Sequence, residues 1–171
     1  TLLIFCTPLE AALPGDEHWD NQFGPVGPND AAQTVAILGG DIYIGGSFTA
    51  AGSSKASCLA RYDGTNWSAL GNGVQGDTSS LKVNALASDA TTLYAGGNFA
   101  NVDGLLTPAR SIAKWNGSFW TALGSGIDGQ VYSIALQGSN VYAGGAITAA
   151  GGTNANGIAR WDGARWNALG N

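Results

Sequence analysis

The chain repeats a unit of about 48 residues three times, and this self-similarity at a fixed period predicts a fold built from stacked, similar units. One motif, DIYIGGSF at residues 41–48, returns as TLYAGGNF at 92–99 and as NVYAGGAI at 140–147. A second, LARYDGTNWSALGNGV at 59–74, returns as IAKWNGSFWTALGSGI at 112–127 and as IARWDGARWNALGN at 158–171. A short apolar run precedes each unit, and Val35, Val83 and Val131 in these runs are equally spaced. No other feature of the sequence limits the possible fold as much.

Each unit contains four apolar segments of about five residues, the usual length of a β-strand. Four antiparallel strands in a period of this length are typical of a β-propeller blade, whereas the coils of a stacked β-helix are shorter. We therefore predict an all-β fold, a β-propeller with three four-stranded antiparallel blades that form a partial ring. The predicted blades span about 31–76, 77–129 and 130–171.

Turn residues and aromatic residues recur at fixed places in the three units. Asp63-Gly64, Asn116-Gly117 and Asp162-Gly163 separate the third and fourth predicted strands, where such pairs favour tight hairpin turns. Paired glycines end each second strand, where they permit a bulge or a close backbone approach. Aromatic rings should recur where one blade packs on the next, and these rings are Tyr43, Tyr94, Tyr142, Tyr62, Trp115, Trp161, Trp67, Trp120 and Trp166.

Two glycine sextets, GNGVQG at 71–76 and GSGIDG at 124–129, fit the spacing G-x-G-x-x-G of a dinucleotide phosphate loop. Such a loop must leave a strand and open a helix, so that the helix N-terminus faces the phosphates. Apolar runs with strand patterning follow both sextets instead. The sextets are therefore predicted to be turns between blades.

The first residues have the composition of a secretory leader. The apolar run at residues 1–9 has the length of a signal-peptide core, so we expect residues 1–14 to be the remnant of a signal peptide. An additional N-terminal strand is the alternative. Residues 15–30 are expected to form a lead-in segment to the first blade. Cys6 and Cys58 are the two cysteines, too few for a metal site or a disulfide framework.

The repeats resemble those of known propeller proteins. The series LYAGGNF and IAKWNGSFWTALGSGI is similar to kelch-type repeats of secreted bacterial proteins and to the repeat domain of fungal cortical cell-polarity markers. The segment HWDNQFGPVGPNDAAQTV at 18–35 resembles the entry segment of the bacterial group. The resemblance implies a propeller architecture and, from the surface-anchored fungal proteins, an extracellular or cell-surface location. It implies no particular activity.

Three blades are fewer than the four to eight of most propellers. Leaving the outer faces of the first and last blades in water would forgo on the order of 10 kcal/mol of apolar burial. We expect that additional blades complete the ring, or that two chains associate into a homodimeric six-bladed ring; the first arrangement is the simpler one. The segment around Trp19 and Phe23 is a candidate to help closure.

The charged residues exclude some partners and supply no catalytic set. The net charge of −5, with seven dispersed Lys and Arg, argues against nucleic acid, and no segment predicts membrane insertion of the mature chain. His18 is the single histidine, so no Ser-His-Asp triad or His-rich metal site can form. Asp63 and Asp162 fall in turns, as do Asp77, Asp103 and Asp128 beside glycines, where side-chain turns explain them. Arg61, Lys114 and Arg160 recur at one position, which suggests a salt bridge or packing on an aromatic ring. We predict no catalytic, cofactor-binding or metal-binding residue, and no cofactor.

The longest connections give the one indication of function. Residues 47–57, 98–111 and 146–156, with the insertion at 75–82, all belong to one face of the predicted disc. Loops on a rigid scaffold often carry binding residues, so this face is the expected recognition surface for a protein or glycan ligand. The alternatives are a fragment of a larger propeller enzyme with its catalytic residues elsewhere, and a structural repeat of a large surface protein.

Overall fold

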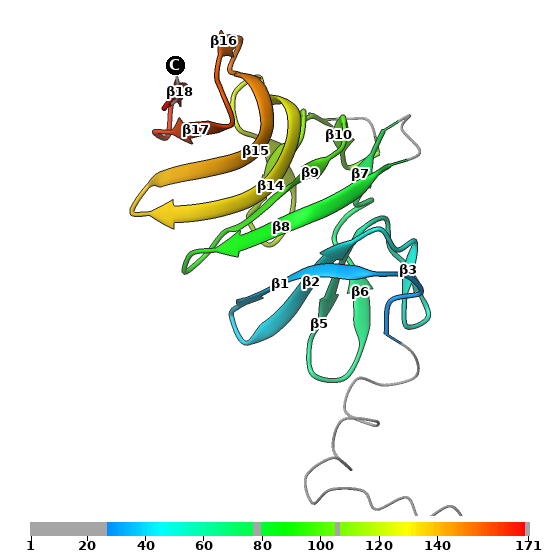
Figure 1. The fold of residues 1–171 in the computed structure, drawn as a ribbon. Coiled ribbons are helices and arrows are strands. Elements are labelled where there is room, and N and C mark those ends of the chain that lie inside the picture. Colours follow the sequence, from blue (N-terminus) through cyan, green and yellow to red (C-terminus); the bar gives the residue numbers. More distant parts are fainter. Residues whose placement is uncertain (1–26, 77–79, 105–106, 170–171) are drawn as a thin grey trace, which may run out of the picture.

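The computed structural model of the chain describes residues 27–76, 80–104 and 107–169 (Figure 1). The predicted signal peptide, Cys6, His18, the Trp19–Phe23 segment and Asp77 lie outside these residues. The described residues contain strands and no helix, and most strands belong to three antiparallel sheets, two of four strands and one of five, that follow one another along the chain. The predicted all-β class is therefore confirmed.

We call the three sheets blades 1, 2 and 3. Blade 1 consists of β1 (Ala32–Leu38), β2 (Asp41–Gly46), β5 (Leu59–Tyr62) and β6 (Trp67–Ala69). Blade 2 consists of β8 (Lys82–Ser88), β9 (Leu93–Asn98), β12 (Ile112–Trp115) and β13 (Trp120–Ala122). Blade 3 consists of β14 (Ile127–Gln137), β15 (Asn140–Ala150), β17 (Ile158–Trp161) and β18 (Trp166–Ala168).

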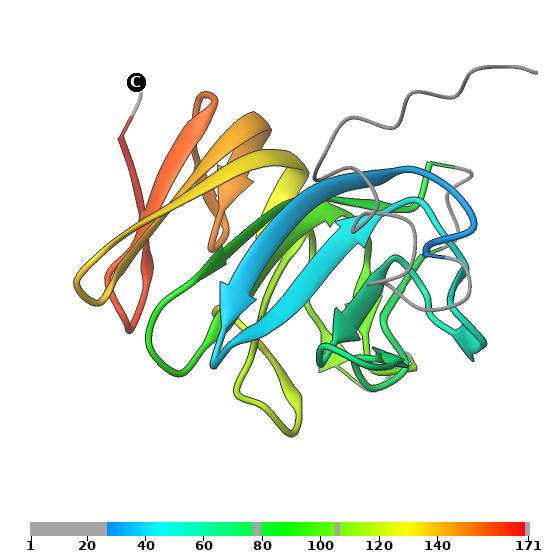
Figure 2. The same ribbon diagram turned by 90° about the horizontal axis from the view of Figure 1, so that it is seen from below.

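The blades pack face to face in chain order, as Figures 1 and 2 show from two directions. Strand β8 packs against β1 and β2, and β14 packs against β8 and β9. One apolar cluster joins blades 1 and 2, with Leu59, Leu70 and Val83 almost fully buried. A second cluster joins blades 2 and 3 through Ile112, Leu123, Val131 and their neighbours. Each such side chain contributes about 1.5–3 kcal/mol by leaving water.

The same bulge interrupts the pairing of the first two strands in every blade. It falls between Ala32 and Thr34, between Val83 and Ala85, and between Val131 and Ser133. In each case the paired glycines of the second strand lie opposite, and a Cβ on the second glycine would collide with a backbone carbonyl of the first strand or, in blade 1, with that of Ala31 just before it. The predicted bulge and close backbone approach at the glycine pairs are thus confirmed.

The strand register corrects the alignment of the apolar runs. Val83 pairs with Gly97 and Val131 with Gly145, but Val35 pairs with Ile44, and Ala32 pairs with Gly46. Ala32 is therefore the counterpart of Val83 and Val131, while Val35 corresponds to Leu86 and Ile134. The equal spacing of the three valines was misleading because the first unit is longer than the second. More residues separate Gly45-Gly46 from Gly96-Gly97 than separate Gly96-Gly97 from Gly144-Gly145.

The Asp-Gly and Asn-Gly pairs form wider turns than predicted. Tyr62 pairs with Trp67, which leaves a four-residue loop at 63–66. Only the glycine has a positive φ, 93° at Gly64, and the Asp63 carboxylate accepts the backbone N–H groups of Thr65 and Asn66. Asn116 and Asp162 accept equivalent bonds in the other blades. The Asp or Asn residue thus stabilises the turn as a hydrogen-bond acceptor, and its own φ is not positive.

The long connections form a second tier of small antiparallel hairpins, which the sequence did not reveal. In blade 1, β3 (Ala50–Ala51) pairs with β4 (Ser54–Lys55). In blade 2, β10 (Asn101–Val102) pairs with both β11 (Thr107–Pro108) and β7 (Val74–Gln75). In blade 3, β16 (Thr153–Asn154) pairs with the end of β15, which also pairs with the start of β14. We call the side that carries these hairpins the hairpin face; the labels β16, β10, β7 and β3 mark it in Figure 1.

The two glycine sextets are turns that lead into this tier. Gly71 and Gly73 have positive φ, and the following Val74 begins β7. Gly124 and Gly126 repeat that geometry before β14. Among the described residues the next element after the first sextet is strand β8, and the second sextet runs into β14, so the prediction of turns between blades is confirmed.

Candidate binding pocket between blades 2 and 3

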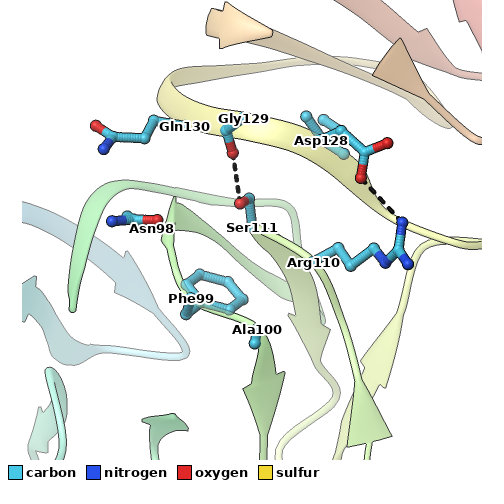
Figure 3. Close-up of a pocket in the computed structure, with 9 residues that line it drawn as sticks. Asn98, Phe99, Ala100, Arg110, Ser111, Asp128, Gly129 and Gln130 are labelled. Carbon is cyan, nitrogen blue, oxygen red and sulfur yellow. Dashed lines mark hydrogen bonds and ion pairs between the residues drawn. The ribbon is translucent and has the colours of Figure 1, made fainter. Parts of the chain in front are cut away.

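An open pocket of about 450 Å³ lies on the hairpin face where blade 2 meets blade 3. Its walls come from the segment after β9, from the residues before β12 and from the first residues of β14. The first two of these segments belong to a single connection, residues 98–111, which the sequence placed on the recognition face. Figure 3 shows the lining, which consists of Asn98, Phe99, Ala100, Arg110, Ser111, Ile127, Asp128, Gly129 and Gln130.

Two polar links hold the opposite walls together. The Ser111 hydroxyl donates to the carbonyl of Gly129 over 2.6 Å, and the Arg110 guanidinium contacts the Asp128 carboxylate at 2.9 Å (Figure 3). Both side chains of the ion pair are about half exposed or more, so that pair adds little stability. The Ser111 bond is part-buried, and it fixes one wall of the pocket relative to the other.

The backbone at this wall is strained. Arg110 and Ser111 have φ of 38° and 65°, a region that side-chain-bearing residues rarely adopt. Cys58 in blade 1 and Gly157 in blade 3 occupy the place of Ser111 and also have positive φ, 64° and 79°. The conformation therefore belongs to the blade design, since the carbonyls of Cys58, Ser111 and Gly157 each accept a bond from the second glycine of β2, β9 or β15.

The arrangement suits a polar ligand. The side chains of Asn98 and Gln130 lie at one end of the pocket and the Arg110–Asp128 pair at the other, with Phe99 and Ala100 below (Figure 3). Amide groups donate and accept hydrogen bonds, and the ion pair adds a cationic and an anionic group. The pocket can therefore hold neutral groups rich in hydroxyls or amides.

Six of the predicted aromatic residues pack where two blades meet: Tyr43, Trp115 and Trp120 between blades 1 and 2, and Tyr94, Trp161 and Trp166 between blades 2 and 3. Trp67 packs instead in a cluster within blade 1, and the rings also pair differently than expected. Tyr62–Trp67, Trp115–Trp120 and Trp161–Trp166 are cross-strand pairs within one hairpin, with ring centroids 5.1, 5.3 and 5.6 Å apart. The link between blades comes from the indole N–H groups. Trp120 donates to the carbonyl of Leu70 in blade 1 over 3.1 Å, and Trp166 donates to that of Leu123 in blade 2 over 2.7 Å.

The recurring cationic position has a different environment in each blade. Arg61 forms an ion pair of 2.7 Å with Asp41, as the sequence suggested. Lys114 is exposed, and the Nε atom of Arg160 is buried without a hydrogen-bond partner among the described residues.

The acidic residues hold the scaffold. Asp103, expected to form a local turn, instead accepts the backbone N–H of Asn72, 31 residues away, and so joins the first sextet to the β10 hairpin. Asp128, also expected in a local turn, pairs with Arg110.

Among the residues that the structure describes, no three His, Cys, Asp or Glu side chains gather closely enough to hold a metal ion. Burial raises the pKa of the Cys58 thiol to about 11, so this cysteine is mostly protonated at neutral pH.

Within the described ranges there is also no helix with the length and apolar character needed to cross a bilayer.

A search of curated proteins finds no match to the chain. A family of propeller domains does match, over residues 37–171, which is well over half of the chain. These residues include β2, β5 and β6 of blade 1 and all of blades 2 and 3, together with the pocket. The resemblance to the repeat domain of the fungal cortical markers is thereby confirmed, and the chain belongs to the family described as the Rax2 C-terminal beta propeller domain.

Proposed function

We propose that the chain is a secreted or cell-surface propeller module that binds a protein or glycan on its hairpin face and has no catalysis of its own. The observation that carries this proposal is the pocket between blades 2 and 3, whose polar lining is presented by two packed blades. A β-propeller domain is in general a binding or structural module, and binding residues commonly lie on connections supported by a rigid scaffold.

The extracellular part of the proposal has separate support. The apolar run at residues 1–9 has the length of a signal-peptide core, and the acidic composition suits a soluble surface. The kelch-type similarity to secreted bacterial repeat proteins points the same way. Fusion of the predicted signal peptide and lead-in segment to a reporter enzyme, followed by fractionation of the culture, would test export directly; retention of the reporter inside the cell would count against it.

The binding part is tested with glycan and peptide arrays probed with the full chain. Ala100 is exposed on the floor of the pocket, so Ala100→Arg fills the pocket without disturbing the core. Ser118 lies exposed in the β12–β13 turn, outside the pocket, and Ser118→Arg is the matched control. Binding should fall at least tenfold in Ala100→Arg and stay unchanged in Ser118→Arg.

Two results would contradict the proposal. One is the absence of binding on both arrays by a chain whose circular dichroism shows a folded sheet protein. The other is equal binding by wild type and Ala100→Arg, which would move the ligand away from this pocket. A chain that binds nothing but retains the fold would favour the structural-repeat alternative.

A further inference from the structure

A second pocket, of about 300 Å³, lies where the connection from blade 2 meets the hairpins of blade 3. Trp161 and Trp166 supply its aromatic lining, and Ser125, Thr153 and Arg165 supply its polar side chains. Ser125 belongs to the connection that enters β14, and Thr153 begins β16, which packs against β18 (Figure 1). We call this site the tryptophan pocket. Its lining shares no residue with the pocket between blades 2 and 3.

The corresponding place in blade 2 is covered by an aspartate. A Cβ on Gly71, the first glycine of the first sextet, would collide with the Asp103 carboxylate, which accepts the backbone N–H of Asn72 over 3.1 Å. Gly151 occupies this position in blade 3. Its N–H donates to the third glycine of the second sextet, as that of Asp103 donates to the third glycine of the first, and the two φ angles are 61° and 60°. Because glycine has no side chain, another group covers the second sextet.

That group in blade 3 is an aromatic ring. A Cβ on Gly124 would lie 2.9 Å from Cζ3 of Trp161, so the edge of this indole lies against the turn. Trp115, the counterpart in blade 2, is 8% exposed, whereas Trp161 is only partly buried. Trp166 holds the ring in place, with the two centroids 5.6 Å apart and its own N–H bonded to the carbonyl of Leu123. Blade 3 therefore presents an accessible indole on a rigid support.

Arg165 carries the only charge among the described residues that line the tryptophan pocket. Its side chain is 81% exposed, and its ion pair with Asp162 is long, at 3.7 Å. The Asp162 carboxylate already accepts the backbone N–H groups of Ala164 and Arg165 and the amide of Asn167. The guanidinium is therefore available to a ligand, and its planar set of donors matches a carboxylate.

These groups together identify a class of ligand. An indole presents a flat apolar face, which suits the C–H face of a sugar ring. The hydroxyls of Ser125 and Thr153 can donate to and accept from sugar hydroxyls, whereas the guanidinium of Arg165 can only donate. We propose that the tryptophan pocket binds an acidic sugar of a glycan, with the sugar ring on Trp161 and its carboxylate on Arg165. This site is separate from the one proposed above, and its ligand is more narrowly defined.

Isothermal titration calorimetry of the full chain tests the proposal. The probes are a panel of oligosaccharides that carry uronic or sialic acids, and the same panel after the carboxylates have been reduced to alcohols. Wild type should bind at least one acidic member and should bind its reduced form at least tenfold more weakly, because the reduced form has no charge to pair with Arg165.

Arg165→Gln isolates the contribution of the guanidinium. It should weaken binding of the acidic member at least tenfold and leave binding of the reduced form unchanged, so that the two forms bind alike. Lys55→Gln is the matched control, since it removes the same charge from an exposed position in the β3–β4 hairpin of blade 1. Lys55→Gln should bind both forms as wild type does.

Gly151→Asp copies the arrangement of blade 2 into blade 3. Asp103 adopts almost the same φ, so an aspartate is compatible with this backbone, and its carboxylate would enter the tryptophan pocket and repel an acidic sugar. Binding should become undetectable while circular dichroism still shows a folded sheet protein. If this variant did not fold, Arg165→Gln would still decide the matter, because its side chain is mostly exposed and outside the core.

Ala100→Arg, in the pocket between blades 2 and 3, should leave this binding unchanged and so separates the two sites. The proposal would be overturned by the absence of binding to every acidic member, by equal binding of the reduced forms, or by wild-type affinity in Arg165→Gln. Loss of the binding in Ala100→Arg would overturn it too. Binding of peptides alone on the arrays would exclude the acidic sugar and leave the function proposed above standing.

Discussion

At the scale of single residues, the blade repeat depends on glycines that leave room for a neighbouring strand. Gly96 does not have a positive φ, so its role is spatial rather than conformational. The Val131 side chain fills the space that a Cβ would need. Glycine costs conformational entropy in a strand, and here the close packing of two blades offsets that cost.

Gly96→Ala should therefore destabilise the protein by about 1–3 kcal/mol, the usual cost of overpacking a core. Gly144→Ala is the matched control, because the nearest heavy atom to its Cβ position is the Ser133 hydroxyl at 2.8 Å, which can rotate away. Urea denaturation of wild type and of both variants measures the two changes. Equal losses at the two sites would argue against the packing role of Gly96.

At the scale of elements, the fourth-strand tryptophans of blades 2 and 3 each bond to the preceding blade. Trp120 is 3% exposed, and its N–H bond to Leu70 is buried. If this donor is removed, the buried Leu70 carbonyl has no hydrogen bond in place of the one it gave up with water on folding. The hydrogen bond is directional, unlike the apolar contacts around it, so it specifies where the next blade sits.

Trp120→Phe should cost more than Trp115→Phe, by about 1–2 kcal/mol for the unsatisfied Leu70 carbonyl. Both substitutions remove the same atoms from rings of one hairpin, and the described contacts of Trp115 include no hydrogen bond. The comparison of their free energies of unfolding in urea isolates the hydrogen bond. Equal costs would mean that ring packing alone carries the effect.

The β17–β18 turn makes a prediction about acid stability. Backbone N–H groups of Arg165 and Ala164, and then the Asn167 amide, lower the pKa of Asp162 to about 2. A carboxyl whose folded pKa is depressed stabilises the fold above its unfolded pKa, 3.8, and loses that contribution as the pH falls toward about 2. Asp162→Asn keeps an oxygen acceptor, as Asn116 does in blade 2, but it does not titrate.

Wild type should accordingly exceed Asp162→Asn in stability at pH 7, and the difference should shrink between about pH 4 and pH 2. Urea denaturation between pH 7 and pH 2 measures this difference in unfolding free energy. Because Asp162 is partly exposed, added salt should make the difference smaller. A gap that stays constant down to pH 2 would show that the charge of Asp162 does not contribute.

At the scale of the whole molecule, the blades differ in how much of their surface is covered. Blade 2 packs on both neighbours, whereas blades 1 and 3 each pack on one. In a repeat protein, each unit is stabilised by its own contacts and by its interfaces with neighbouring units. Blade 2 has two such interfaces and should therefore unfold last.

Hydrogen exchange should therefore show the slowest amides in β8, β9 and β12, with faster exchange in β1 and β17. Mass spectrometry of peptides from each blade measures this pattern. Uniform protection would mean that the three blades unfold as one unit.

The sequence was sufficient for the class of fold, because each part of the evidence was local. Strand length, the Asp-Gly and Asn-Gly turns and the glycine pairs act within a few residues, and the threefold repetition made each signal stronger than it would be alone. The interpretation of the glycine sextets as turns rested on the same local reasoning. It needed only the observation that strand-like segments, not helical ones, follow each sextet.

The register of the first strand, the hairpin tier and the pocket required the tertiary structure. Val35 and Ala32 exchange roles only because a bulge and a longer first unit shift the pairing. Very short strands such as β7 and β10 have no periodicity to detect, and they form because segments far apart in the sequence lie side by side. Asp103, Asp128 and Arg110 find partners in other units, which composition cannot predict.

The amino-acid sequence by itself determined that this protein is a set of similar antiparallel sheets, since hydrophobic alternation and turn chemistry act along the chain. Only the tertiary structure decided how the sheets meet, because a meeting between blades depends on the direction of an indole N–H and on the space above a glycine. The same contacts bury Leu70 and Leu123, whereas Leu169, at the corresponding place in blade 3, is 50% exposed.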